Sequence, residues 1–154
     1  MAPSIHVRSY VPDDAPFVLQ LAPRLVIGIP PWRDAERWLA TAQGWLTGSM
    51  ARFGEETMIF IAEDEQGERV GAATVSHDQH FTGERQAYIG ELAVREAAEG
   101  CGAGRALVEA CSTWARQQGY TLLVLQTGTA NTRARGFYEH LGFLEEDVRL
   151  TKRV

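Results

Sequence analysis

The glycine-rich loop at residues 99–104, E-G-C-G-A-G, limits most strongly what this chain can fold into. It stands between a β-rich run at 85–96 and a run with helical periodicity at 104–118. Glycine lets a backbone approach a ligand closely, and the first turn of a helix offers unpaired N–H groups at the positive end of its dipole. The loop therefore predicts a strand-loop-helix unit whose helix N-terminus binds an anion such as a phosphate.

Two familiar phosphate loops do not fit this spacing. A Walker loop requires Gly-Lys followed by Ser or Thr, whereas Gly104 is followed by Arg-Ala. The dinucleotide pattern G-x-G-x-x-G also fails, because its third glycine position holds arginine or leucine, depending on whether the count starts at Gly100 or Gly102. The loop belongs to another class of phosphate-binding unit.

Hydrophobic patterning predicts six strands around this unit. The run 120–127 is apolar enough to be buried on both faces of a sheet and to need a parallel partner. The runs 57–64 and 69–76 are joined by a short glycine-bearing connection and predict an antiparallel hairpin. The other predicted strands are 5–11, 85–96 and the alternating run 148–154.

Four helices are predicted between these strands. The first covers 15–22, with Asp13 and Asp14 as candidate caps, and the second begins at Asp34 and carries its apolar residues at helical spacing. The third is 104–118, followed by Gly119 in a C-terminal capping position. The fourth is 132–141. The expected fold is α/β, with a mixed, mostly antiparallel central sheet flanked by helices on both sides.

Composition narrows the class of protein. The 154 residues suffice for one domain with a real core, and 45% hydrophobic residues are typical of a globular chain. A net charge of −5 argues against a nucleic-acid surface. Cys101 and Cys111 are expected to be free thiols of an intracellular chain. With no secretory h-region and no stretch of membrane-spanning length, we expect a cytoplasmic protein that does not associate with membranes.

Two motifs together resemble the GCN5-related N-acetyltransferase (GNAT) family. The run E-L-A-V-R-E-A-A-E-G-C-G-A-G matches the family's acyl-CoA loop, Q/R-x-x-G-x-G/A, with Gly102 and Gly104 at its small positions. Asn131 and Ala134, followed by F-Y-E-H-L-G-F at 137–143, match its second motif. The resemblance spans about 88–143. It implies a GNAT-like fold, a single acyl-CoA N-acetyltransferase domain over 1–154, and acetyl-CoA as co-substrate.

The resemblance also implies a set of residues that bind acyl-CoA. This chain departs from the family at Glu99, where Gln or Arg is usual, and at Cys101, where a basic residue is common. A carboxylate would repel a pyrophosphate unless the Glu99 side chain points to solvent and contributes only its N–H. Because the family's phosphate contacts are mainly backbone amides, the resemblance implies that the loop still binds acyl-CoA. The implied cofactor-binding residues are Leu92, Ala93, Val94, Glu99, Gly100, Cys101, Gly102, Ala103, Gly104, Arg105, Asn131, Ala134, Phe137 and Tyr138.

For catalysis the resemblance implies direct attack of an amine on the thioester in a ternary complex. An N–H near Leu92 would face the thioester oxygen, and Tyr138 would protonate the departing thiolate. The alternative for Tyr138 is a residue that packs its helix against the sheet. Glu91 is the candidate general base, and its alternative is a solvated or salt-bridged strand carboxylate.

The acceptor site is the least determined part of the sequence. Trp32 and Arg33, in the variable stretch 23–34, and His77 and His80 are candidate substrate-binding residues. The H-D-x-H spacing of these two histidines suggests a metal, but no third ligand is evident, so no metal is expected. The expected acceptor is a primary amine of a small molecule, peptide or protein, and the chain is a monomer or homodimer. The alternative functions are a catalytically silent acyl-CoA-binding sensor and a structural domain that has lost CoA.

Overall fold

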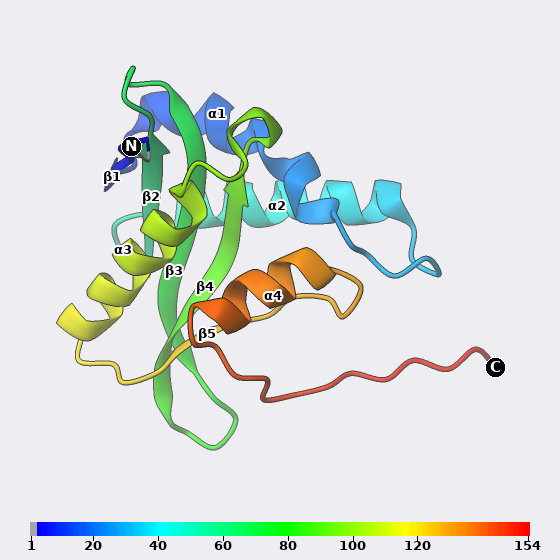
Figure 1. Cartoon of the computed structure of the whole chain (residues 1–154). Helices are drawn as coiled ribbons and strands as arrows, with labels where there is room; N and C mark the ends of the chain where they lie inside the picture. Colours follow the sequence, from blue (N-terminus) through cyan, green and yellow to red (C-terminus); the bar gives the residue numbers. More distant parts are fainter. Residues whose placement is uncertain (1–2) are drawn as a thin grey trace.

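The computed structural model describes residues 3–154 as one five-stranded sheet with helices on both faces (Figure 1). The strand order is β1-β2-β3-β4-β5. Neighbours from β1 to β4 are antiparallel, and β5 runs parallel to β4, so the predicted mixed, mostly antiparallel sheet is confirmed. The strands are β1 (His6–Ser9), β2 (Thr57–Glu63), β3 (Arg69–Gln79), β4 (Arg85–Val94) and β5 (Leu123–Leu125).

The helices divide between the two faces of the sheet. In Figure 1, α2 (Ala35–Ala51) crosses behind the strands, while α3 (Ala103–Gln117) and α4 (Thr132–His140) lie in front. The short α1 (Ala15–Gln20) shares the face of α2. The part of the chain that the structure describes also has three 3₁₀ turns: η1 (Pro12–Asp14), η2 (Ala22–Val26) and η3 (Glu96–Ala98). Within the described residues, no helix is long and apolar enough to cross a lipid bilayer.

Each face of the sheet carries its own hydrophobic core. On the α3 side, Leu107 and Cys111 of the helix pack with Val75 and Ile89 of the strands. On the other side, Leu46 of α2 packs in a second cluster with residues of α1 and β2. The buried residues of this cluster are Tyr10, Val18, Leu21, Ala22, Ala42, Leu46, Ile59, Ile61, Ala72 and Ala93. Burial of both faces explains why the central strands are apolar along most of their length.

Residues that the sequence analysis identified as caps lie at the start of α2 and at the end of α3. The Asp34 side chain accepts a hydrogen bond from the Arg37 N–H at 2.9 Å and so caps α2, as its position predicts. Gly119, at φ +84°, follows α3 in the left-handed conformation that favours glycine, which confirms its C-terminal capping position.

One predicted strand is wrong. Residues 148–154 alternate as a strand would, but they are extended and belong to no strand of the sheet. The segment leads away from the body of the molecule (Figure 1). A segment with alternating polar and apolar residues forms a strand only when a neighbouring strand supplies hydrogen bonds. Among residues 3–154 no strand lies beside this segment.

Asp14 occupies the N-cap position of α1, as predicted, but its side chain does not cap the helix. Its side chain is fully buried and makes no cap hydrogen bond to α1. Instead its two oxygens accept hydrogen bonds from Arg8 at 2.7 and 2.8 Å, from Arg69 at 2.6 Å and from the Val11 N–H at 2.8 Å. The Arg8 guanidinium holds the pKa of Asp14 well below its usual range, against the opposing effect of burial. The carboxylate therefore joins β1, β3 and the start of α1.

We expect Asp14→Asn to lower the free energy of unfolding by about 1–3 kcal/mol, because it removes the charge from a fully buried carboxylate that accepts hydrogen bonds from the partly exposed guanidinium groups of Arg8 and Arg69. Since the folded-state pKa is depressed, the stabilisation is present above the unfolded value of about 3.9 and is lost as pH falls below it. Urea unfolding at pH 7 and pH 3 measures both effects, and the difference between the variant and the parent should shrink at pH 3. Asp13→Asn removes the same charge at an exposed position and serves as control; equal losses in the two variants would contradict the assignment.

Candidate active site

The centre of the candidate site is a β-bulge in β4. Ala73 pairs with Leu92 and Val75 pairs with Ile89, so one residue of β3 faces two residues of β4, at positions 90 and 91. The extra residue reverses the alternation of side chains along the strand. Ile89 and Leu92 both pack on the α3 side, and the residues at 91 and 93 turn to the α2 side.

Beyond the bulge, β4 loses its partner on one edge. Its pairing with β5 ends at Ile89 and Leu125, whereas β4 continues to Val94. From Gly90 onward the edge of β4 that faced β5 therefore has no neighbouring strand among residues 3–154. The Arg24 side chain donates a hydrogen bond to the Val94 carbonyl at 2.9 Å. A strand edge of this kind can pair with an extended ligand that carries amide groups.

Glu91 is turned into the protein by the bulge. It is only 9% exposed, and its carboxylate accepts hydrogen bonds from the Ser49 hydroxyl at 2.6 Å and the Thr74 hydroxyl at 3.1 Å. The Thr74 hydroxyl in turn accepts the backbone N–H of Glu91 at 3.0 Å. The interpretation of Glu91 as a solvated or salt-bridged carboxylate is therefore wrong: within the described chain it is held by two hydroxyl groups and no cation.

The glycine loop leads into the first turn of α3. Gly100 at φ +78° and Gly102 at φ +90° adopt the left-handed conformation, and Gly102 is the N-terminal cap of the helix. The Ala106 N–H donates to the Gly102 carbonyl at 3.1 Å, which closes the first turn. The backbone N–H groups of 102–105 have no backbone acceptor among residues 3–154. They form the set of free donors that favours an anion.

Gly104 has a different role from the loop glycines. It lies within α3, and a Cβ at this position would stand 3.1 Å from the Phe137 ring of α4. The missing side chain lets the two helices approach, so the two sequence motifs meet in space.

Asn131 caps α4, since its side-chain oxygen accepts the Ala134 N–H at 3.3 Å. Gly28, at φ +76°, passes so close to Asn131 that a Cβ would lie 2.6 Å from it.

Glu99, whose orientation the sequence leaves open, turns its side chain toward two arginines. Its carboxylate forms ion pairs with Arg24 of η2 and with Arg133 of α4, the latter at 2.6 Å. Arg24 and Arg133 hold the pKa of Glu99 below its usual value. Its negative charge therefore faces two guanidinium groups beside the glycine loop. Neither arginine was predicted: Arg24 is 75 residues from Glu99, and no local pattern links them.

Tyr138 lies in an apolar environment between the helices. Burial, together with the nearby Cys111 of α3, raises the pKa of its phenol to about 12. Burial also raises the pKa of the Cys111 thiol to about 12. The Tyr138 ring lies 5.2 Å from that of Phe137 and 5.6 Å from that of Phe143, both nearly perpendicular. The phenol thus keeps its proton at neutral pH while its ring packs, so the two interpretations of Tyr138 are compatible.

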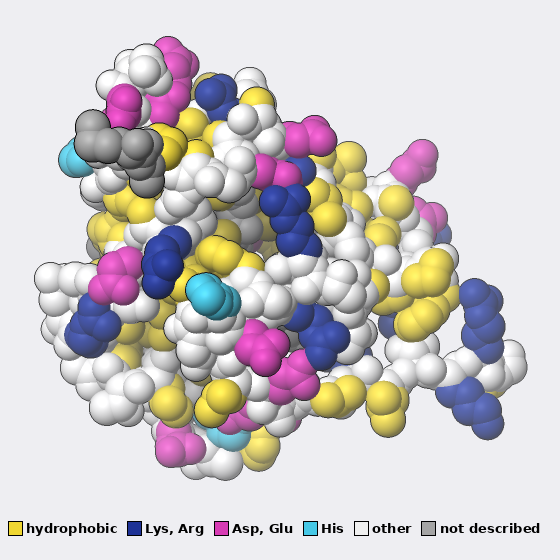
Figure 2. Space-filling view, viewed as in Figure 1, with side chains coloured by type: hydrophobic (Ala, Val, Ile, Leu, Met, Phe, Trp, Pro, Cys, Tyr) yellow, Lys and Arg dark blue, Asp and Glu magenta, His cyan; other side chains and the backbone are white. Residues whose placement is uncertain are grey.

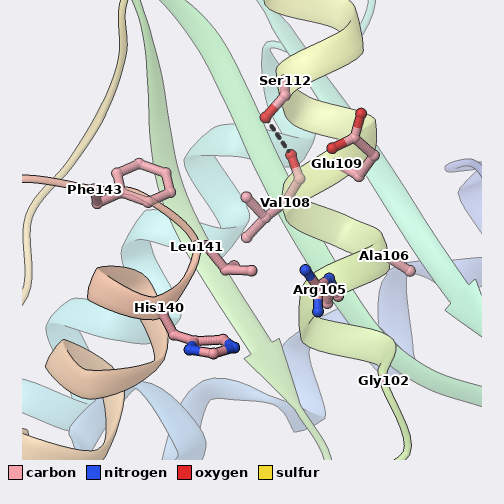
Figure 3. Close-up of a pocket in the computed structure, with 9 residues that line it drawn as sticks. All are labelled: Gly102, Arg105, Ala106, Val108, Glu109, Ser112, His140, Leu141 and Phe143. Atoms are coloured by element: carbon pink, nitrogen blue, oxygen red, sulfur yellow. Dashed lines mark hydrogen bonds between the residues drawn. The ribbon is translucent and has the colours of Figure 1, made fainter.

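A groove of about 440 Å³ runs between α3 and the end of α4. In Figure 3 the Arg105 and His140 side chains reach into it from the two helices. It begins at the glycine loop and continues along α3, so it adjoins the free N–H groups described above. The lining residues are Gly102, Arg105, Ala106, Val108, Glu109, Ser112, His140, Leu141 and Phe143.

Four predicted acceptor residues are not gathered at this centre. Trp32 and Arg33 are exposed in the loop between η2 and α2. His77 pairs with Ala87, five positions from Leu92 along β4, and its Nδ1 lies 2.5 Å from the Tyr120 hydroxyl. His80 lies in the β3–β4 connection, where it bonds Thr82 and stacks on Phe81. No group of three or more His, Cys, Asp or Glu side chains within residues 3–154 is placed to hold a metal.

Residues 19–143 match the acetyltransferase (GNAT) family, and the chain belongs to that family. Its fold agrees with this membership. A putative acetyl transferase from Pyrococcus furiosus has a TM-score of 0.77 at 21% identity, with 98% of this chain and all of that chain covered. The aminoglycoside N-acetyltransferase AAC(6')-Iy, solved in complex with CoA, has a TM-score of 0.69 at 18% identity, covering 100% and 97%.

Among curated proteins, the chain is similar to an L-methionine sulfoximine/L-methionine sulfone acetyltransferase of Pseudomonas paraeruginosa. The two are 30% identical over 112 residues, which cover 73% of this chain and 63% of the relative. The chain thus spans less than two thirds of the length of that relative.

Proposed function

We propose that the chain is a single N-acetyltransferase domain over 1–154 that moves an acetyl group from acetyl-CoA to the primary amine of a small molecule. One arrangement carries this proposal: the unpaired edge of β4 after the bulge leads directly into the free N–H groups at the start of α3. A ligand with an amide-bearing arm joined to a pyrophosphate matches that sequence of a strand edge followed by an anion site. Acyl-CoA has this construction.

The binding residues fall into three groups in this proposal. Leu92, Ala93 and Val94 supply the strand edge for the amide-bearing arm, and the loop from Glu99 to Arg105 surrounds the pyrophosphate. Asn131, Ala134, Phe137 and Tyr138 form the wall contributed by α4. Arg24 and Arg133 offset the charge of Glu99, which supports phosphate binding despite the carboxylate. The groove between α3 and α4 gives the nucleotide end of the cofactor about 440 Å³ of adjoining volume.

Two side chains support the reaction in this proposal, Tyr138 at the departing thiolate and Glu91 at the attacking amine. Tyr138 stays protonated because its pKa is about 12, and so it can donate a hydrogen bond to the thiolate that forms as the thioester breaks. The high pKa makes it a weak acid, so this hydrogen bond is its main contribution. Glu91 is buried and engaged by Ser49 and Thr74, so it accepts the proton of the amine through a water molecule. The amine attacks the thioester directly, and no covalent enzyme intermediate forms.

A small-molecule acceptor is favoured by the relatives. One similar protein is named for L-methionine sulfoximine and L-methionine sulfone, and one similar structure is an aminoglycoside N-acetyltransferase. Trp32 and Arg33, exposed in the loop before α2, remain the proposed contacts for the acceptor on that side. His77 and His80 are proposed at its outer rim, and no metal is needed.

The function is tested by measuring CoA release with a panel of amines. The panel includes L-methionine sulfoximine, L-methionine sulfone, an aminoglycoside, a polyamine and a lysine-bearing peptide. We expect acetylation of at least one small molecule, confirmed by mass spectrometry as a gain of one acetyl group. Binding of acetyl-CoA without turnover on any amine would instead favour the catalytically silent sensor. No binding of acetyl-CoA would favour a structural domain.

Gly102→Val tests the anion site. The left-handed backbone of Gly102 strains any side chain at this position, so the loop must change conformation. Losing two or more N–H contacts to a charged group weakens acetyl-CoA binding by about 100-fold or more, measured by calorimetry. Gly83→Val is the matched control, because Gly83 has φ +94° and equally open space in the β3–β4 connection. Similar affinities for the two variants would contradict the assignment.

Tyr138→Phe tests the role of the phenol. The variant removes one oxygen and keeps the packing, so acetyl-CoA affinity should stay within a few-fold of the parent. Loss of a hydrogen bond to a developing charge lowers kcat by about 10- to 100-fold. Tyr10→Phe removes a phenol oxygen from the core beside α1 and should leave kcat unchanged. Full turnover by Tyr138→Phe on an amine that the parent acetylates would leave Tyr138 as a packing residue only.

A further inference from the structure

Two carboxylates are buried among residues 3–154, and the protein holds them in different ways. Asp14 accepts hydrogen bonds from two arginines. Glu91 meets no cation at ion-pair distance within the described chain. The other acidic side chains are less buried, and on the face in Figure 2 they stand at the surface together with Lys and Arg side chains. A buried charge without a cationic partner is destabilising, so Glu91 points to a role other than stability.

The Ser49 hydroxyl behaves differently from the other hydroxyl groups of its helix. Ser49 lies in the last turn of α2, the helix that crosses behind the strands in Figure 1. The Thr41 and Thr47 hydroxyls each donate to the helix carbonyl four residues earlier, at 2.9 Å, as is common for these residue types. Ser49 instead donates out of its helix, to Glu91 Oε1 at 2.6 Å. Its single hydroxyl hydrogen is thus used on the carboxylate.

Thr74 of β3 holds the second oxygen of the same carboxylate. Its hydroxyl oxygen accepts the Glu91 N–H at 3.0 Å, and its hydrogen is donated to Glu91 Oε2 at 3.1 Å. The two hydroxyl groups therefore engage different oxygens, one from α2 and one from β3, and together they restrict rotation of the carboxylate. Since a carboxylate has more acceptor positions than these two bonds use, it can still accept a proton.

We propose that Ser49 and Thr74 are positioning residues that hold the Glu91 carboxylate in the orientation in which it accepts the proton of the attacking amine. The inference rests on the proposed function and adds the residues that orient its base. An N–H bond of the ammonium breaks, the proton passes through a water molecule to a carboxylate oxygen, and the freed nitrogen lone pair attacks the thioester carbonyl carbon. Neither hydroxyl group touches the reacting atoms. Their effect on the rate comes through Glu91, because a displacement of about 1 Å at a reacting group can lower a rate by about 100-fold.

Ser49→Ala tests the proposal with an amine that the parent acetylates. Alanine removes the hydroxyl group and is well suited to a helix. We expect kcat to fall by about 10- to 100-fold because the base loses its orientation. The dissociation constant and the KM for acetyl-CoA should stay within about two-fold of the parent, since the cofactor contacts lie elsewhere. Thr47→Ala removes an exposed hydroxyl group from the same helix and should keep the kcat of the parent.

A double variant separates a positioning role from a packing role. In Glu91→Gln the base is absent, so Ser49 has nothing to orient. Adding Ser49→Ala to Glu91→Gln should therefore lower kcat by less than about two-fold further, although the same substitution has a large effect in the parent.

Thr74 provides an independent measurement of the same role. Thr74→Val removes the hydroxyl group and should lower kcat as Ser49→Ala does. Thr74→Ser keeps the hydroxyl group and should stay within about three-fold of the kcat of the parent. Thermal unfolding of each variant checks that it is folded at the assay temperature.

The possible contradictions can be told apart. A Ser49→Ala variant with the kcat of the parent would mean that Glu91 needs no support from α2. Equal losses from Ser49→Ala in the parent and in Glu91→Gln would make Ser49 a packing residue. Both results overturn the positioning role and leave the proposed acetyl transfer intact. A parent that acetylates no amine would overturn the proposed function and the positioning role together.

Discussion

The extra residue in β4 opposite Thr74 is the constraint on which the site depends. Without it, strict alternation along β4 would place positions 89, 91 and 93 on one face, and Glu91 would point into the core below α3. With it, Glu91 meets Ser49 and Thr74 on the α2 side, while Leu92 stays in the α3 core. A Cβ at Gly90 would lie 3.1 Å from the Thr74 hydroxyl, so a small residue is favoured at the bulge. The single insertion both positions the carboxylate and coincides with the end of pairing to β5.

The second requirement is that the two motifs lie side by side although some thirty residues of sequence separate them. Contact between α3 and α4 depends on Gly104, whose missing side chain makes room for the Phe137 ring. The packed rings of Phe137, Tyr138 and Phe143 then fix where the phenol lies. The glycine spacing of the loop thus serves two purposes. Gly100 and Gly102 provide left-handed backbone before the helix, and Gly104 provides close packing within it.

The sequence predicted the elements that depend on local patterns. The central strands, the three longer helices, the Asp34 cap and the Gly119 termination follow from hydrophobic period and terminal residues, and the structure has them within a few positions. Features that depend on distant partners could not be predicted. Asp14 resembles a cap until Arg8 and Arg69 are placed beside it. The bulge was likewise hidden, because its evidence is the register with β3 and not the composition of β4.

Long-range charge pairing explains the largest difference at the site itself. Considered alone, Glu99 beside an anion-binding loop is unfavourable, and only solvent exposure would relieve the repulsion. The fold instead places Arg24 and Arg133 on either side of it, from elements before and after the loop in sequence. The same Arg24 donates to the Val94 carbonyl, so this one side chain links η2, the end of β4 and the loop. Charge balance at the loop is therefore a property of the tertiary structure.

The early separation of β4 and β5 has consequences for both strands. On the inner side it leaves the edge of β4 beyond Ile89 free, which gives a ligand access to backbone groups. It also restricts β5 to three paired residues, and a strand this short contributes little sheet stability by itself. The same separation that shortens β5 therefore gives an extended ligand access to the backbone of β4 between Gly90 and Val94.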